Sequence, residues 1–547
     1  MRAVEAEPEP FSDGDHRDEQ IIRRFSSAIL NGWRYPLLKA AWGKLLLFLI
    51  PAGLCAVRAY VGLIGSRGFS HDAFMLLDGA WRVLNGQRPH IDFYSHVGFL
   101  TYLPTAIGLR ISHGTAWGLG YGQALVGLLL GIWTYLLGRK RLADVSLALM
   151  CISVVLMVVA PFALGFSPMK PGPAMIYNRQ GYALLALVLL EAFSETRRRS
   201  RQEEFWGGFS TGAALSILFF LKITYFAAGV FLLVALLPCR QQTKQRWTGI
   251  VGGCVAVTFA CCAYFGFHLG PMEHDLVTIG GGKHMRWSWY LIDAVIESAG
   301  VAAALASGVT LLLAAQSEGR AARSVAILGL AVTVGGVALI FGNYEQSGFP
   351  MTVFLAIIAL NVAMVKVVPT SRSAELFEAA VLLLGSVLIA GSLFSGAMGT
   401  AFAFGQRVFF HRTTAFDSPA LSGFTTGPDD DWYTALVNDG IPLVEKYRRP
   451  GDTLMSLDFS NPFSYSLGMK PAYGGTSVFQ YGTTFNDRFK PSPAFLMGSA
   501  DLVAVPKTAS DPTLDNNVPR LYGPYLLSHF HLIGESRDWR LYRRNGE

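Results

Sequence analysis

Runs of about twenty apolar residues recur along this 547-residue chain, from Leu45 to about Phe404. A helix of that length, rising 1.5 Å per residue, spans the ~30 Å hydrocarbon core of a bilayer. The composition agrees, because 52% of the residues are hydrophobic and only 15% are charged, against about 25% charged in soluble domains. A soluble enzyme, a nucleic-acid-binding protein and a disordered scaffold are therefore excluded for most of the chain. The sequence predicts a polytopic α-helical membrane protein.

About eleven membrane-spanning helices are expected. The apolar segments fall near residues 45–64, 115–137, 143–165, 180–194, 205–221, 223–238, 247–268, 289–315, 324–342, 349–367 and 376–400. Basic residues cluster in alternate connections, at 139–141, 197–201, 240–246, 320–323 and 366–372. The positive-inside rule puts these connections in the cytoplasm. We therefore expect a protein of the cytoplasmic (inner) membrane with a cytoplasmic N-terminus and an extracytoplasmic C-terminus.

Two stretches need a particular interpretation to keep this topology. Residues 206–237 are almost continuously apolar except for Lys222, and one helix over them would be about 48 Å long. We expect two helices joined by a turn at Lys222 on the outer face. Residues 97–113 are short and contain Pro104 and Arg110, so we expect a helix at the outer surface that does not cross.

Three regions follow from these patterns. Residues 1–44 form a cytoplasmic segment, compatible with an amphipathic helix on the membrane and equally with an unstructured tail. Residues 45–404 form the transmembrane domain, with a large first outer loop at 65–114. Residues 405–547 carry 14 basic and 15 acidic residues, and they alternate strand patterns (453–459, 501–506, 531–536, 539–543) with a helical pattern at 521–530. This predicts an extracytoplasmic α/β domain.

The first outer loop contains an ordered series of polar and turn-forming residues. In sequence order these are His71, Asp72, Asn85, Gly86, Pro89, Asp92 and Phe93. The series resembles the first periplasmic loop of the glycosyltransferase C superfamily, whose members carry acidic residues just after the first helix and then a Gly-x-x-Pro-x-x-Asp-Phe-like segment. His71 departs from the usual acidic pair.

The resemblance implies an inverting membrane glycosyltransferase that takes a sugar from a polyprenyl-phosphate donor. The acceptor would be a glycan, a lipid or a protein of the cell envelope, and the lipid bilayer and donor are the expected partners. A nucleic-acid partner is not expected. No cofactor is indicated with certainty; a divalent cation is compatible with the superfamily, although the sequence has no Asp-x-Asp motif.

Asp72 is the residue we expect to act as the catalytic base. Glycosyl transfer to a hydroxyl group needs a group that accepts the hydroxyl proton while positive charge develops at the anomeric carbon. The alternative is that Asp72 caps the helix that follows it. His71 could tune Asp72, bind the leaving phosphate or be an interface histidine. Asp92 could orient the acceptor or fix the turn after Pro89.

Positive charge is expected near the departing phosphate. Lys222 is the strongest candidate because an ionisable residue within a long apolar stretch often has a function, although its side chain could instead reach the lipid headgroups. Arg179, at the outer start of the fourth apolar segment, is a second candidate with the same alternative. Lys283 and Arg286 follow a Gly-rich stretch. Such a stretch beside cations can hold a phosphate, and the alternative is a flexible outer loop. Glu345, at another outer turn, could bind sugar hydroxyl groups or be a solvated turn residue.

Two other functions stay open at this point. A transporter or flippase for lipid-linked sugars would carry paired charges in mid-membrane and internal repeats, and the sequence has no clear repeat. A non-catalytic envelope scaffold of the same fold would bind lipid or polymer through its outer domain.

Overall fold

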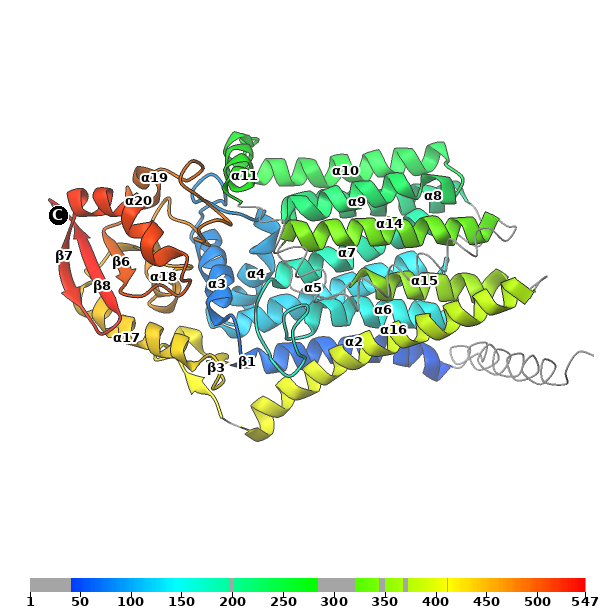
Figure 1. The fold of residues 1–547 in the computed structure, drawn as a ribbon, viewed down its shortest axis with the longest axis horizontal. Helices are drawn as coiled ribbons and strands as arrows, with labels where there is room; N and C mark the ends of the chain where they lie inside the picture. The colour runs from blue at the N-terminus through cyan, green and yellow to red at the C-terminus, as the bar shows by residue number, and fades with distance from the viewer. Residues whose placement is uncertain are drawn as a thin grey trace, which may run out of the picture.

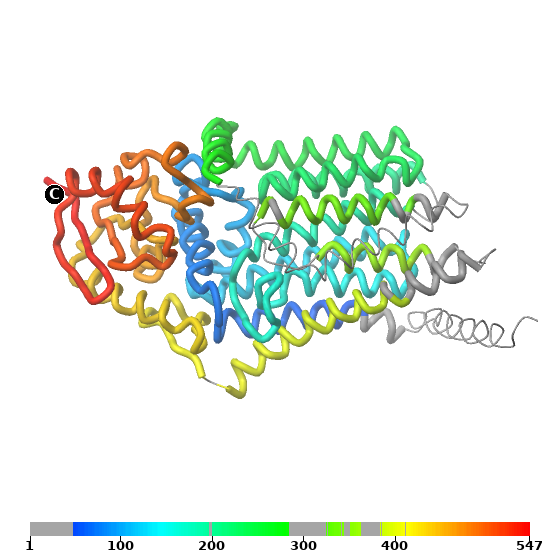
Figure 2. The backbone as a smooth tube through the Cα atoms, in the orientation of Figure 1, coloured from blue at the N-terminus to red at the C-terminus, as the bar shows by residue number. Residues whose placement is uncertain are grey.

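The computed structural model describes residues 41–195, 200–283, 320–343, 350–366, 372–410 and 412–546. A bundle of helices occupies one end of an elongated molecule, and a mixed α/β domain that contains the C-terminus occupies the other (Figure 1, Figure 2). The N-terminal segment 1–40, including the proposed amphipathic helix, lies outside the described residues.

The long bundle helices coincide with the apolar segments of the sequence. They are α2 (Ala41–Val61), α5 (Trp117–Gly138), α6 (Asp144–Val159), α7 (Ile176–Phe193), α8 (Arg201–Leu221), α9 (Ile223–Ala235), α10 (Lys244–Tyr264), α14 (Arg320–Asn343), α15 (Met351–Lys366) and α16 (Arg372–Gly405). The remaining predicted span, 289–315, lies outside the described residues. Within the described ranges, four helices are long and apolar enough to cross a membrane: 117–138, 201–221, 244–264 and 385–410. The total of about eleven spans therefore stays a prediction.

The predicted break at Lys222 is confirmed. Lys222 has an extended backbone (φ −164°, ψ 122°) between α8 and α9. The outer loop packs directly against this break, because the Gly98 N–H donates to the Leu221 carbonyl at 3.0 Å. A Cβ on Gly98 would lie 1.8 Å from the Phe220 carbonyl oxygen. Only glycine permits this close approach of loop and hairpin.

Glycines also set the distance between α8 and α10. Gly208 and Gly212 on α8 face Gly249 and Gly253 on α10, and a Cβ on any of the four would lie 2.0 to 2.2 Å from a backbone oxygen of the other helix. This spacing of small residues four apart on both helices lets membrane helices pack backbone to backbone.

The first outer loop forms ordered structure against the C-terminal domain. After α2, strand β1 (Leu63–Ser66) pairs in parallel with β3 (Phe424–Thr426), which pairs antiparallel with β2 (Thr414–Ala415). Helix α3 (Ser70–Leu84), the short turn 99–101 and α4 (Leu103–Ile111) follow. Arg82 on α3 donates to the carbonyls of Ala472 and Gly474 at 2.9 Å, so the loop and the C-terminal domain form one packed unit.

The C-terminal domain contains the predicted alternation of strands and helices. Its sheet has the order β5-β4-β6-β8-β7, with β4 (Thr453–Ser456), β5 (Lys470–Pro471), β6 (Leu502–Pro506), β7 (Phe530–Glu535) and β8 (Trp539–Arg544). β4 runs parallel to β5 and β6, while β8 runs antiparallel to β6 and β7. The helices are α17 (Asp431–Tyr447), α18 (Phe463–Ser466), α19 (Pro493–Met497) and α20 (Leu514–His529).

The sequence predicted a flexible loop around the Gly-rich stretch, and this prediction was wrong for the residues up to Gly282. Residues Gly270–Gly282 form helix α11. Its Asp275 carboxylate lies 3.0 Å from His90 Nδ1, and the Gly281 carbonyl accepts from Asn486 of the C-terminal domain at 2.8 Å. These contacts join segments far apart in the sequence, so no local pattern indicated the helix.

We predict that Gly249→Ala destabilises the protein by about 1–3 kcal/mol, the usual range for overpacking, because the new methyl would lie 2.1 Å from the Phe205 carbonyl oxygen. Gly252→Ala is the matched control on the same helix, since its nearest atom is a Phe209 ring carbon at 3.8 Å. Thermal unfolding of the detergent-purified protein measures both. Equal stability of the two variants would contradict the packing described.

Candidate functional site

Asp72 lies in the first turn of α3, and its side chain leaves that helix to meet another. The residue before α3, Phe69, has a left-handed backbone (φ 60°) and makes no side-chain capping hydrogen bond to the helix. The Asp72 carboxylate instead lies near the Met175 backbone N–H, immediately before α7, and this N–H favours its charged form. Asp72 therefore does not cap α3, which was the alternative that the sequence left open. The helix dipole at the start of α7 favours a negative group at this position.

Lys222 meets the same turn of α7. Its Nζ atom donates to Asn178 Oδ1 at 3.0 Å and lies 4.9 Å from the centre of the Tyr177 ring. Met175 and Asn178 are joined within one turn, because the Asn178 N–H donates to the Met175 carbonyl at 2.8 Å. Three residues of helix rise about 4.5 Å, so Asp72 and Lys222 contact neighbouring points of one helix start.

Two further side chains adjoin Lys222. His96 Nε2 lies 3.4 Å from the Tyr177 hydroxyl. Burial, together with the charges of Lys222 and Lys283, lowers the pKa of His96 to about 3. The Lys283 ammonium donates to the Gly342 carbonyl at 2.5 Å, and burial also lowers its pKa. A neutral histidine and two lysines therefore border the start of α7.

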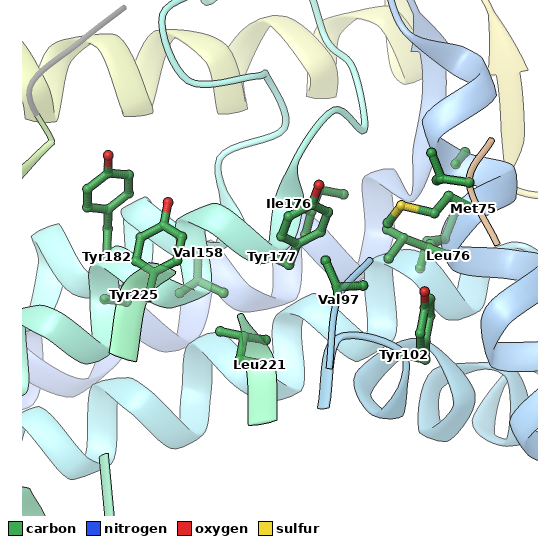
Figure 3. Packing of buried hydrophobic residues seen from close by; sticks show 14 of the residues in the cluster. Met75, Leu76, Val97, Tyr102, Val158, Ile176, Tyr177, Tyr182, Leu221 and Tyr225 are labelled. Carbon is green, nitrogen blue, oxygen red and sulfur yellow. The ribbon is translucent and has the colours of Figure 1, made fainter. Parts of the chain in front are cut away.

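Apolar side chains pack next to Lys222 and His96. Tyr177, Val97 of the outer loop and Leu221 at the end of α8 belong to one buried cluster, and Figure 3 shows their side chains close together. The cluster holds the loop, the hairpin and α7 in contact, which fixes the positions of the polar groups around them.

The environment of Asp72 favours its neutral form. Burial raises its pKa to about 7, the Met175 N–H opposes that change, and the neighbouring Asp430 carboxylate adds to it. His71 Nε2 lies 3.7 Å from the Asp72 carboxylate, but burial lowers the pKa of His71 to about 4. At neutral pH the imidazole is therefore uncharged, and Asp72 titrates where a general base is most effective.

The C-terminal domain contributes residues that the sequence did not single out. Asp430 Oδ2 accepts from the Ser70 N–H at 2.8 Å, and the ring centres of Tyr433 and Phe459 lie 5.9 and 4.4 Å from that of His71. Asp458 is 1% exposed, and burial raises its pKa to about 6. These residues come from helix starts and strand ends separated from α3 by more than 340 positions, so only the fold could bring them to His71.

Arg179 points toward α6. Its guanidinium donates to the carbonyls of Met157 (3.0 Å) and Phe162, and lies 4.7 Å from the centre of the Phe162 ring. It lines a groove of about 420 Å³ between α6, α15 and α16, whose walls are largely apolar. Arg179 is thus one residue from Asn178 along the chain, but its charge sits at the end of this groove.

The other predicted site residues have different settings. Asp92 accepts from the backbone N–H of Arg88 at 2.7 Å, which is the turn-fixing arrangement. Arg286 and Glu345 lie outside the described residues. Within the parts of the chain that the structure describes, no three His, Cys, Asp or Glu side chains are grouped to hold a metal ion, and we derive no step through a metal.

Comparisons with known proteins give a similarity of fold. No protein-family profile matches the sequence, and no curated protein matches it. Two solved structures of ArnT from Cupriavidus metallidurans are similar over 92% of this chain and 98% of theirs. The apo structure has 13% identity and a TM-score of 0.44, and the structure bound to undecaprenyl phosphate has 14% and 0.47. Since both TM-scores are below 0.5, the function proposed below rests on the residues of this chain.

We predict that Asp72→Asn stabilises the protein more at pH 8 than at pH 5. The folded-state pKa of about 7 exceeds the ordinary value of 3.8, so the stability that protonated Asp72 contributes is complete below pH 3.8 and lost as the pH rises through 7. Asparagine cannot lose a proton, so the variant does not lose this stability as the pH rises. Thermal unfolding at both pH values measures the difference. Asp417→Asn, an exposed acid, should show no such pH dependence, and an equal gain for Asp72→Asn at pH 5 and 8 would refute the assignment.

Proposed function

We propose that this protein is a membrane glycosyltransferase, which moves a sugar from a polyprenyl-phosphate donor to a hydroxyl group of an acceptor at the outer face of the membrane. The supporting observation is the start of α7, where the largely buried Asp72 carboxylate lies near the Met175 N–H and Lys222 donates to Asn178. A base and a cation at one helix start suit a reaction in which one oxygen loses a proton and another leaves with negative charge.

In the proposed reaction the acceptor oxygen attacks the anomeric carbon of the donor sugar. The acceptor hydroxyl proton passes to the Asp72 carboxylate as the new carbon–oxygen bond forms. The bond between the anomeric carbon and the phosphate oxygen breaks, and its electron pair leaves with the polyprenyl phosphate. Attack opposite the leaving group inverts the anomeric centre. Lys222 and Lys283 would balance the charge of the phosphate.

The donor lipid would lie along the apolar groove between α6, α15 and α16. An isoprenoid chain is recognised by area and shape, which apolar walls supply. Arg179 closes this groove with a guanidinium held by the Met157 carbonyl at 3.0 Å. The C-terminal domain, which contacts α3 beside Asp72 through Asp430, would contribute to acceptor binding.

We predict that Asp72→Asn lowers kcat by 10²- to 10⁴-fold, the usual contribution of a general base, and leaves the KM for the donor within a few-fold. For the wild type, the rate should rise with pH through about 7, because the base acts when deprotonated and burial raises its pKa to that value. The measurement is transfer from polyprenyl-phosphate sugars to mixed acceptors by the purified full chain.

Asp417→Asn serves as the control for this experiment, because its side chain is exposed and carries the same charge. Wild-type turnover by Asp72→Asn would eliminate Asp72 as the base. If the wild type moved labelled lipid between leaflets without transferring sugar, the transporter alternative would replace the proposal.

We predict that Lys222→Gln weakens binding of polyprenyl phosphate by about 10- to 100-fold, since a hydrogen bond to a charged group contributes about 1.5–3 kcal/mol. Lys470→Gln, on an exposed position of the C-terminal domain, should bind as the wild type does. Equilibrium binding of a fluorescent polyprenyl phosphate to each variant gives the affinities. Unchanged affinity for Lys222→Gln would remove Lys222 from the phosphate site.

A further inference from the structure

A second cavity lies at the end of the bundle away from the C-terminal domain. It has a volume of about 590 Å³ and is formed between the end of α5, the connection that follows it and the start of α8. Among the described residues its charged lining side chains are Arg139, Lys140, Arg141 and Glu203, three positive charges against one negative, which is paired with Lys140 at 2.7 Å. The proposed glycosyl-transfer site at the start of α7 does not include this cavity.

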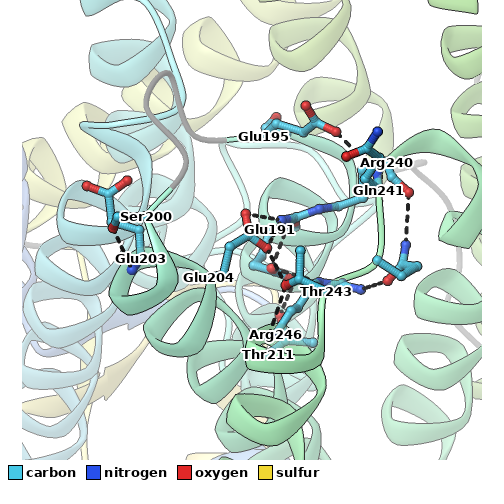
Figure 4. A network of polar contacts seen from close by, with 12 residues as sticks. Glu191, Glu195, Ser200, Glu203, Glu204, Thr211, Arg240, Gln241, Thr243 and Arg246 are labelled. Carbon is cyan, nitrogen blue, oxygen red and sulfur yellow. Dashed lines mark hydrogen bonds and ion pairs between the residues drawn. The ribbon is translucent and has the colours of Figure 1, made fainter.

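A buried ionic network adjoins this cavity. Arg240 and Arg246 both donate to the Glu191 carboxylate at 2.8 Å, and Arg240 also binds Glu204 at 2.7 Å (Figure 4). All four side chains are 4% exposed or less. Charges removed from water in this way are stable only when opposite charges and hydrogen bonds compensate them.

Arg141 connects the network to the cavity and leaves it with surplus positive charge. A Cβ on Gly207, in the cavity wall, would lie 2.4 Å from Arg141 Nη2 and 3.3 Å from the Glu191 carboxylate. Among the described residues, three buried arginines (141, 240 and 246) therefore share two buried carboxylates (191 and 204). One positive charge has no buried counterpart.

The side chain of Arg141 is also incompletely bonded. Arg141 is 7% exposed; its Nε donates to the Ser194 carbonyl at 3.2 Å and its Nη1 to the Leu137 carbonyl at 3.0 Å. Its Nη2 is buried without a hydrogen-bond partner. An unbonded charged donor in a cavity wall is costly, and an anion that enters the cavity would satisfy it.

The remaining walls indicate what kind of anion fits. Leu136 and Trp206 line the cavity and are 52% and 56% exposed, and Trp133, also in its wall, donates to Ser210 at 2.7 Å. Tryptophans of this kind favour the interface between headgroups and acyl chains. An apolar wall beside a basic rim suits a molecule with a phosphate headgroup and a hydrocarbon chain.

We propose that this cavity binds an acidic phospholipid of the bilayer. Its phosphate would lie against Arg139, Lys140 and Arg141, and one acyl chain would lie along Leu136 and Phe209. The bound lipid supplies the negative charge that the network lacks, so it stabilises the end of the bundle where α5, α7, α8 and α10 meet. The site does not depend on the glycosyl-transfer proposal.

Native mass spectrometry of the full chain, purified in detergent and titrated with phosphatidylglycerol, phosphatidylcholine or inorganic phosphate, tests this site. We expect the wild type to retain one phosphatidylglycerol in preference to phosphatidylcholine. The variant Arg139→Gln with Lys140→Gln should bind phosphatidylglycerol at least tenfold more weakly. Lys244→Gln, an exposed cation at the same end that does not line the cavity, should bind as the wild type does.

Arg141 is tested by charge retention, because its removal could disturb the network. Arg141→Lys should keep preferential binding, and phosphatidylglycerol should raise the Tm of the wild type more than that of the Arg139→Gln, Lys140→Gln variant. Equal retention of phosphatidylglycerol by wild type and double variant would overturn the proposal. Displacement of the lipid by equimolar inorganic phosphate would overturn the assignment to a phospholipid and identify a free phosphate site instead.

Discussion

The ion pair between Asp78 and Arg82 on α3 is the interaction on which the arrangement of the outer half depends. Arg82 Nε lies 2.7 Å from the Asp78 carboxylate, both side chains are fully buried, and the same guanidinium lies 5.1 Å from the centre of the Phe93 ring. Its Nη1 atom donates to two carbonyls of the C-terminal domain, those of Ala472 and Gly474. A buried arginine needs all of these partners, so α3 has one stable position between the loop and that domain.

With α3 fixed, its first turn carries Asp72 to the start of α7. The hairpin at Lys222 also lies at the start of α7. It is held against the 65–114 loop, because Gly98 allows the loop to touch the hairpin backbone. The site is therefore assembled by three connections that are far apart in the sequence, and none of them forms it alone. This explains why a single apolar cluster, with Tyr177 inside it, underlies all of the polar groups.

Ionisable residues gather at both ends of the helix bundle, but their surroundings differ between the two ends. At the end next to the C-terminal domain, burial shifts single groups such as Asp72 and His71 toward their neutral forms, which suits proton transfer. At the opposite end, Arg240 and Arg246 both donate hydrogen bonds to the Glu191 carboxylate. Asp72, with its pKa raised to about 7, can exchange a proton near neutral pH. The ionic network instead joins helices and leaves a surplus cation beside a cavity.

The sequence by itself determined the helices, the break at Lys222 and the alternation in the C-terminal domain, because apolar period and length are local properties of a chain. It also indicated Asp72 and Lys222, since ionisable residues near long apolar runs are few. Tertiary structure alone decided that Asp92 serves its own turn, that Arg179 points to α6, that Asp430 binds the Ser70 N–H and that His96 lies beside Tyr177. Those outcomes depend on which distant backbone N–H or carbonyl lies within hydrogen-bond distance, and no local pattern encodes that.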